Sequence, residues 1–209
     1  MTELIIECVP VGALQANCYI VGCPKTKVGA VIDPGADPHR ILAVVRQLGL
    51  KIEAIINTHG HADHIGGNSK VKDATGAKIM IGKADAPMLT SAAANLSMWT
   101  GTPVRSYEAD QTLEEGDTVK IGEVELKVME TPGHTPGGIC LVAPRVVFTG
   151  DTLFAGSIGR TDFPGGNYEQ IIRSIREKIL PLGDNVRVLP GHGPETTVGQ
   201  EKITNPFLT

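Results

Sequence analysis

The stretch Thr58 to Gly67, THGHADHIGG, concentrates potential metal ligands in one short segment of this sequence. It holds three of the chain's six histidines and one aspartate, and it is punctuated by glycine. Zinc, iron and manganese accept imidazole nitrogens and carboxylate oxygens as ligands, and glycines let a tight loop turn several side chains toward one point. A polar surface loop that happens to carry histidine is the simpler alternative, but half of the histidines gather here. The stretch therefore predicts a metal site with four candidate ligands: His59, His61, Asp63 and His64.

Short apolar runs and helical repeats alternate along the rest of the chain. The run Ile52 to Ile56 is typical of a buried strand and leads directly into the histidine loop. Further strands are expected at 4–9, 17–21, 28–32, 78–81, 118–121, 124–129, 139–142, 146–149 and 186–189. Helices are expected at 38–48, 69–75, 83–96 and 167–180. Because both halves mix strands with helices, the pattern predicts an α/β layered domain.

The composition suits a soluble globular chain that forms one domain over residues 1–209, with 41% hydrophobic and 20% charged residues. The net charge of −4 and the absence of a Lys/Arg cluster argue against a nucleic-acid partner. No run approaches the ~18 apolar residues that would span a membrane. The N-terminus has no basic segment followed by an apolar one, and the four cysteines show no CxxC spacing. We therefore expect a cytoplasmic protein without a membrane partner.

Three more candidate ligands follow strand-like runs, each in a loop rich in glycine or proline. His134 lies in TPGHTPG (131–137), Asp151 in TGDTLF (149–154) and His192 in PGHG (190–193). A lone histidine is more often structural than a ligand, but five of the six histidines now lie in such loops. The exception, His39, is interpreted as a polar residue near a helix start. Loops held on strand ends are common places for functional side chains.

Together, the THxHxDH run, GHTPG, GDTLF and the final GHG resemble the metallo-β-lactamase fold family over nearly the whole chain. The resemblance implies an α/β fold of the four-layer αββα sandwich type, with a dinuclear metal centre at one edge of the sheets. It implies a first metal held by His59, His61 and His134, and a second held by Asp63, His64 and His192. Asp151 would bridge both. Two divalent metal ions are thus expected, with zinc preferred and iron or manganese open, because this ligand set accepts all three.

Charge considerations independently favour hydrolysis. Two divalent cations offset by the carboxylates of Asp63 and Asp151 leave a site of about +2, which favours a metal-bridging hydroxide. Asp63 is expected to orient that hydroxide as well as to bind metal. A thiolate, from a thiol with a pKa around 8.5, leaves with little help from an acid. Thioester hydrolysis therefore fits the predicted centre.

Within the family, the bridging aspartate and two further segments resemble the short bacterial form of type II glyoxalase (hydroxyacylglutathione hydrolase-like). These segments are GSIGRTDFPGG (156–166) and ITNPFL (203–208). We expect no C-terminal helical domain of the kind that long type II glyoxalases carry. The resemblance implies a small-molecule substrate, an S-acylglutathione or similar hydroxyacyl thioester such as S-lactoylglutathione. It also implies that Arg160 binds an anionic thiol carrier, although an ion pair with Asp162 explains this arginine equally well.

Two alternatives stay open at this stage. A persulfide dioxygenase shares the fold family and would use a single iron at positions matching His59, His134 and Asp151. A metal-binding redox module without hydrolase activity, like the flavodiiron proteins, would need a flavin domain that 209 residues do not accommodate. The PGHG segment around His192 favours the hydrolase. The metal, the acyl group, the thiol and the oligomeric state are not determined by the sequence.

Overall fold

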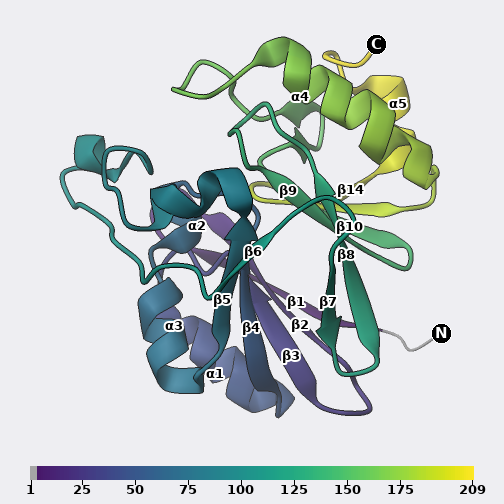
Figure 1. The fold of residues 1–209 in the computed structure, drawn as a ribbon. Coiled ribbons are helices and arrows are strands. Elements are labelled where there is room, and N and C mark those ends of the chain that lie inside the picture. The colour runs from purple at the N-terminus through teal and green to yellow at the C-terminus, as the bar shows by residue number, and fades with distance from the viewer. Residues whose placement is uncertain (1–3) are drawn as a thin grey trace.

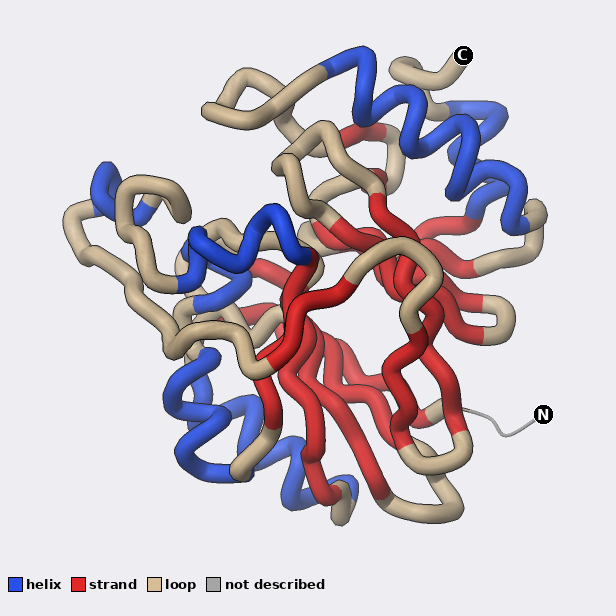
Figure 2. The backbone as a smooth tube through the Cα atoms, in the orientation of Figure 1, coloured by secondary structure: helices blue, strands red, loops and turns tan. Residues whose placement is uncertain are grey.

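The computed structural model describes residues 4–209 and shows two six-stranded sheets packed face to face (Figures 1 and 2). The first sheet has the strand order β1-β2-β3-β4-β5-β6. Its strands are β1 (Ile5–Val11), β2 (Ala16–Gly22), β3 (Val28–Ile32), β4 (Lys51–Asn57), β5 (Lys78–Gly82) and β6 (Gln111–Leu113). The pairs from β3 to β6 are parallel, whereas β1, β2 and β3 pair antiparallel. The loops that follow β3, β4 and β5 therefore leave the sheet at the same edge.

The second sheet has the order β14-β13-β10-β9-β8-β7. Its strands are β7 (Thr118–Ile121), β8 (Val124–Glu130), β9 (Ile139–Ala143), β10 (Val146–Gly150), β13 (Arg187–Pro190) and β14 (Thr196–Thr197). Strand β9 is antiparallel to both neighbours, and β10 is parallel to β13. As a result β8, β10 and β13 run in one direction and end at one edge. A small hairpin, β11 (Leu153–Phe154) with β12 (Ser157–Ile158), follows β10.

Helices cover both outer faces of this sandwich (Figure 1). On the first sheet lie α1 (Pro38–Leu48) and α3 (Asn68–Thr75), and on the second lie α4 (Tyr168–Ser174) and α5 (Val198–Thr204). Helix α4 continues into a π-helical turn (Ile175–Ile179) and a 3₁₀ turn (Leu180–Leu182). A single helical turn, α2 (Ala62–Ile65), sits within the histidine loop, and two 3₁₀ segments follow β5: η1 (Lys83–Leu89) and η2 (Ser97–Thr100). No helix within residues 4–209 is long and apolar enough to cross a membrane.

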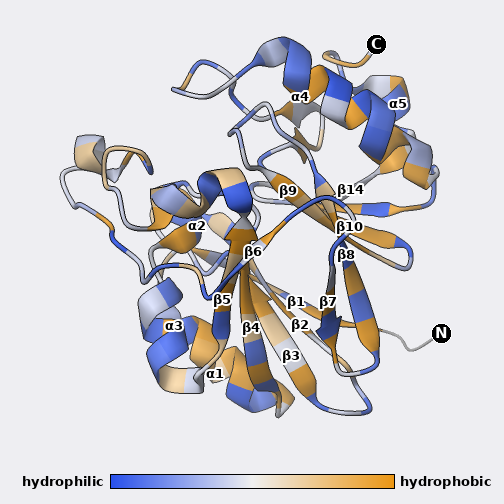
Figure 3. Cartoon of the chain, in the orientation of Figure 1, coloured by the Kyte–Doolittle hydropathy of each residue, from blue (hydrophilic) through white to orange (hydrophobic). Residues whose placement is uncertain are grey.

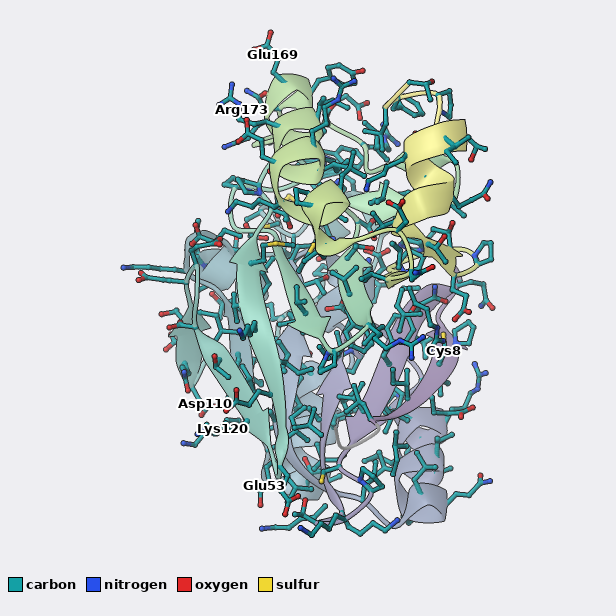
Figure 4. All side chains as sticks on the ribbon, turned by 90° about the vertical axis from the view of Figure 1, so that its right-hand side faces the viewer. Cys8, Glu53, Asp110, Lys120, Glu169 and Arg173 are labelled. Carbon is teal, nitrogen blue, oxygen red and sulfur yellow. The ribbon has the colours of Figure 1, made fainter. Side chains whose placement is uncertain are left out.

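Three hydrophobic clusters join the four layers. The central one lies between the sheets, where the Phe148 ring meets the Tyr19 ring edge-on at 5.2 Å between centroids. A second cluster joins α1 and α3 to the first sheet, and a third joins α4 and α5 to the second. Apolar strand residues therefore concentrate inside the sandwich (Figure 3), while Glu169 and Arg173 of α4 point outward (Figure 4). The predicted four-layer αββα sandwich is confirmed.

The predicted helix at 83–96 is wrong. Only η1 is helical there, as a 3₁₀ turn, and residues 90–96 form turns. Pro87 lies inside η1, and its ring removes a backbone donor and blocks a continuous α-helix. The sequence patterns also did not predict β6 or α5, which are a three-residue edge strand and a seven-residue helix.

Candidate metal centre

All seven predicted ligands converge at the edge where the strand ends of both sheets meet. The loop after β4 and the turn α2 carry His59, His61, Asp63 and His64, and the β8–β9 loop carries His134. Asp151 directly follows β10, and His192 follows β13. Three groups of side chains bring their ligand atoms within 4.8 Å of one another. His59, His61 and His134 form the first set, and Asp63, His64 and His192 form the second, as predicted. The third group joins His59 and His64 with Asp33.

The nitrogen and oxygen atoms within each set are in close contact. In the first set, His61 Nδ1 lies 2.9 Å from His134 Nε2. In the second, His64 Nε2 lies 3.3 Å from His192 Nε2, and Asp63 Oδ2 lies 3.2 Å from His192 Nε2. The ligand atoms of each set therefore converge on one point.

The carboxylate of Asp151 lies between the two sets. Its Oδ2 is 3.7 Å from His134 Nε2 and 3.6 Å from His192 Nε2. Its Oδ1 is 3.4 Å from His64 Nε2, without the alignment of a hydrogen bond. Asp151 therefore contacts members of both sets, as the bridging position requires.

The residues present fit a pair of metal ions. Around a tetrahedral zinc ion with bonds of about 2.0–2.1 Å, neighbouring ligand atoms lie roughly 3.3 Å apart. The distances between the ligand atoms given above range from 2.9 to 3.7 Å, which is close to that value. His59 Nε2 and Asp151 Oδ1 are also buried without a hydrogen-bond partner among residues 4–209. Buried polar atoms in folded proteins nearly always have a partner, and a metal ion would supply one to each.

Groups outside the two sets orient the histidine rings. The Nδ1 atoms of three rings face acceptors: His64 faces Asp33 Oδ2 at 3.1 Å, His134 faces the Arg160 carbonyl at 2.7 Å, and His192 faces the Leu14 carbonyl at 3.2 Å. Carboxylate and carbonyl oxygens only accept, so each Nδ1 carries the proton. The Nε2 atoms thereby face the centre, as is typical of metal-binding histidines.

The protonation of the metal-free centre differs between the two sets. Burial and neighbouring histidines hold the pKa of His59 well below its usual range, and burial lowers the pKa of His61 to about 3. Burial opposes the charged form of His64 as well, but the charges of Asp63 and Asp151 outweigh it and raise its pKa to about 10. Although burial works against ionisation, His64 and His192 lower the pKa of Asp63. The first set is thus ready to accept a cation, while the second is an ion-paired cluster that a metal would reorganise.

Two buried carboxylates near the centre escaped the sequence analysis. Asp33 accepts hydrogen bonds from the Thr58 N–H (2.7 Å) and hydroxyl (2.6 Å) besides its contact with His64. Its position just after β3, the parallel neighbour of β4, was the available signal, because ligand-binding residues gather at the carboxyl ends of such strands. Asp85 of η1 is buried and accepts from the backbone N–H groups of Gly60 and Gly137. No local pattern marked it.

Arg160 lies at the exposed rim of the centre. Its Nε and Nη2 donate to the two carboxylate oxygens of Asp162 at 2.9 and 2.7 Å. Its guanidinium carbon also lies 4.1 Å from the ring centroid of Phe163. The Phe163 ring in turn packs edge-on against the His61 ring, with 5.9 Å between the ring centroids. The alternative interpretation of Arg160, an ion pair with Asp162, is therefore present in the fold, and its role in substrate binding stays a prediction.

Comparison with known proteins agrees with this geometry. The family profile described as the metallo-beta-lactamase superfamily matches residues 11–192. The hydroxyacylglutathione hydrolase GloC of Haemophilus influenzae is 39% identical over 207 residues, covering 97% of this chain and 97% of the relative. The similarity thus extends over essentially the whole of both proteins.

Two solved structures share the fold closely. The BLEG-1 B3 metallo-beta-lactamase superposes with a TM-score of 0.94 at 36% identity, over 98% of this chain and 100% of that one. TTHA1623, solved in a di-iron-bound form, superposes with a TM-score of 0.85 at 35% identity, over 97% of this chain and 100% of that one. A two-metal centre is thus described for a protein of similar fold and length.

Proposed function

Because the chain belongs to the metallo-beta-lactamase superfamily, we propose that it is a metal-dependent hydrolase that cleaves a small thioester of the S-acylglutathione type, such as S-lactoylglutathione. The observation that carries the proposal is the position of Asp151, whose carboxylate lies within 3.4–3.7 Å of nitrogens from both ligand sets. A carboxylate placed between the two ligand sets would hold two metal ions close enough to act together on one substrate carbonyl group. The relative named hydroxyacylglutathione hydrolase supports the substrate class.

The two ions would be held by His59, His61 and His134 on one side and by Asp63, His64 and His192 on the other, with Asp151 between them. When bound, such ions polarise a carbonyl and make water a nucleophile near neutral pH. Zinc remains the preferred expectation, and the di-iron form of TTHA1623 makes iron its rival.

The chain's own groups complete the reaction. The Asp63 side chain is 26% exposed, so water reaches its carboxylate, which can accept a hydrogen bond from the attacking water. Hydrolysis breaks the carbonyl–sulfur bond, and the products are a carboxylate and a thiol. The thiolate needs no dedicated acid, because a thiol pKa near 8.5 makes it a good leaving group. We infer that Arg160 binds an anionic thiol carrier at the rim.

The dioxygenase alternative would use one iron at His59, His134 and Asp151. It leaves the convergence of Asp63, His64 and His192 without a role, which is why we favour the hydrolase. The redox-module alternative gains no support from the relative named as a hydrolase.

The test is an activity panel on one metal-loaded preparation. Thiol release from S-lactoylglutathione is followed colorimetrically, a β-lactam is assayed beside it, and glutathione persulfide is supplied in an oxygen electrode. We expect thioester turnover that chelation abolishes and metal restores. Oxygen uptake or β-lactam cleavage without thioester turnover would overturn the proposal.

A further inference from the structure

The segment η1 lies between the two loops that carry the first ligand set. Gly60 separates His59 from His61, and Gly137 follows His134 in the β8–β9 loop. A Cβ atom at Gly60 would lie 2.5 Å from Met88 Cβ, and one at Gly137 would lie 2.3 Å from the backbone nitrogen of Asp85. Both loops therefore press directly against η1, at distances that only glycine allows.

The side chain of Asp85 ties these loops to each other. It is fully buried, and each of its oxygens accepts one backbone N–H group. Oδ2 accepts from Gly60 at 3.0 Å, and Oδ1 accepts from Gly137 at 2.7 Å. The Gly60 loop leaves the first sheet and the Gly137 loop leaves the second. One carboxylate thus spans the junction of the two sheets beside the first ligand set.

We propose that Asp85 is a positioning residue that fixes His59 and His61 relative to His134, and thereby sets the affinity of the first metal site. The inference rests on the metal centre of the proposed function and not on the substrate. Its physical basis is that the three histidines come from two sheets, so their spacing depends on what holds the two loops together. The second ligand set has its own support, because Asp33 contacts His64. Loss of Asp85 should therefore affect the two sites unequally.

The variant Asp85→Asn keeps the shape of the side chain but replaces one acceptor oxygen by an NH₂ group. Because this NH₂ group would face a backbone N–H group, and both are donors, one of the two hydrogen bonds of Asp85 is lost. Metal-stripped protein is titrated with Co²⁺ against a competing chelator, and loading is followed by the visible absorption of bound cobalt. His134→Ala and His192→Ala provide reference spectra for loss of the first and the second site. Asp110→Asn is the matched control, because this exposed carboxylate also accepts a backbone N–H group, from Ile79 at 2.7 Å, at the periphery of the fold (Figure 4).

We expect Asp85→Asn to weaken the first site by roughly 10- to 100-fold, the usual effect of losing a partner that orients metal ligands. The second site should keep its affinity, so the spectrum should approach that of His134→Ala, whereas Asp110→Asn should titrate like the parent. The unfolding temperature of the metal-free variants is measured in parallel. A lower unfolding temperature with both Co²⁺ affinities unchanged would overturn the proposal, as would an equal loss at both sites.

Gly137→Ala gives an independent test, because its methyl group displaces the loop from Asp85 and leaves the carboxylate in place. The same selective loss of the first site is expected, and this variant decides by the same criteria should Asp85→Asn not fold. Cobalt binding is measured without substrate. A failure of the thioester assay would therefore leave this result intact, and the two failures are distinguishable.

Discussion

Replacing Asp33 by Asn should separate metal affinity at the second site from stability of the fold. The Asp33 carboxylate accepts three hydrogen bonds, two from Thr58 and one from His64 Nδ1. An amide at this position still accepts from the Thr58 N–H group with its oxygen, and the Thr58 hydroxyl can turn to accept from the NH₂ group. The turned hydroxyl can still accept from His59 Nδ1, which lies 3.2 Å away, so His64 Nδ1 is the ring nitrogen that meets a donor where it had an acceptor.

The magnitude follows from those contacts. The metal-free His64 is protonated, and losing one hydrogen bond to a charged group lowers the free energy of unfolding by about 1.5–3 kcal/mol. His64 can restore it only by giving up its Nδ1 proton and keeping a proton on Nε2, the atom that lies 3.3–3.5 Å from His192 and Asp63. That tautomer cannot bind a cation through Nε2, so the second site should weaken roughly 10- to 100-fold, or about 1.4–2.7 kcal/mol. Asp33→Ala instead leaves buried donors unpaired at about 1–3 kcal/mol each, a large share of a typical total stability of about 5–15 kcal/mol.

Two measurements on metal-free protein decide the matter: urea unfolding for stability and Co²⁺ titration against a chelator for each site. We expect Asp33→Asn to lose less stability than Asp33→Ala and to lose affinity at the second site alone. Asp33→Ala should lose both stability and affinity. A second-site affinity for Asp33→Asn equal to that of the parent would refute the argument, and so would a loss confined to the first site.

Three further variants test other parts of the account. Asp151→Ala should weaken both metal sites and lower kcat by several orders of magnitude, whereas His39→Ala, on the exposed face of α1, should do neither. Metal content and thioester turnover are measured for each variant. Full activity of Asp151→Ala would contradict the bridging position of Asp151. Arg160→Ala should raise KM for a glutathione thioester and leave kcat nearly unchanged, which is the sign of a contact made equally in the ground state and the transition state. Steady-state kinetics with a thioester of an uncharged thiol provide the comparison. A collapse of kcat with intact metal content would show the assignment of Arg160 to be wrong. Phe148→Ala removes a buried ring from between the sheets and should lower the free energy of unfolding by about 3–5 kcal/mol, measured in urea; an unchanged midpoint would argue against that core.

Much of the fold was predictable because its signals are local. The apolar run at 52–56 and the glycine-rich loop after it stand side by side in the sequence, and the structure keeps them as β4 and the ligand loop. The helix predicted at 83–96 is wrong because Pro87 lies inside the segment and prevents a continuous α-helix. Asp33 begins the tripeptide Asp33-Pro34-Gly35, whose composition is typical of a tight turn, and it was not predicted as a site residue. It does adopt a left-handed φ of 52°, but its side chain also supports His64 across 31 residues.

The role of Asp85 could not be predicted from the sequence. Its two partners lie 25 and 52 residues away, and both are backbone N–H groups, which every residue except proline carries, so no residue type in the sequence identifies them. The convergence of the seven ligands was predicted through resemblance, and the strand directions explain it. Asp33 had a signal in its position after β3, whereas Asp85 is identified only when the loops of the two sheets are brought together.

The most direct test of the dinuclear centre is elemental analysis of metal per chain, made on the same sample that is assayed for thioester hydrolysis. Seven candidate ligands in two sets joined by Asp151 predict two ions per chain, and turnover should rise with occupancy toward that value. A reproducible content of one iron, unchanged after supplementation with zinc, manganese or iron, would contradict the account.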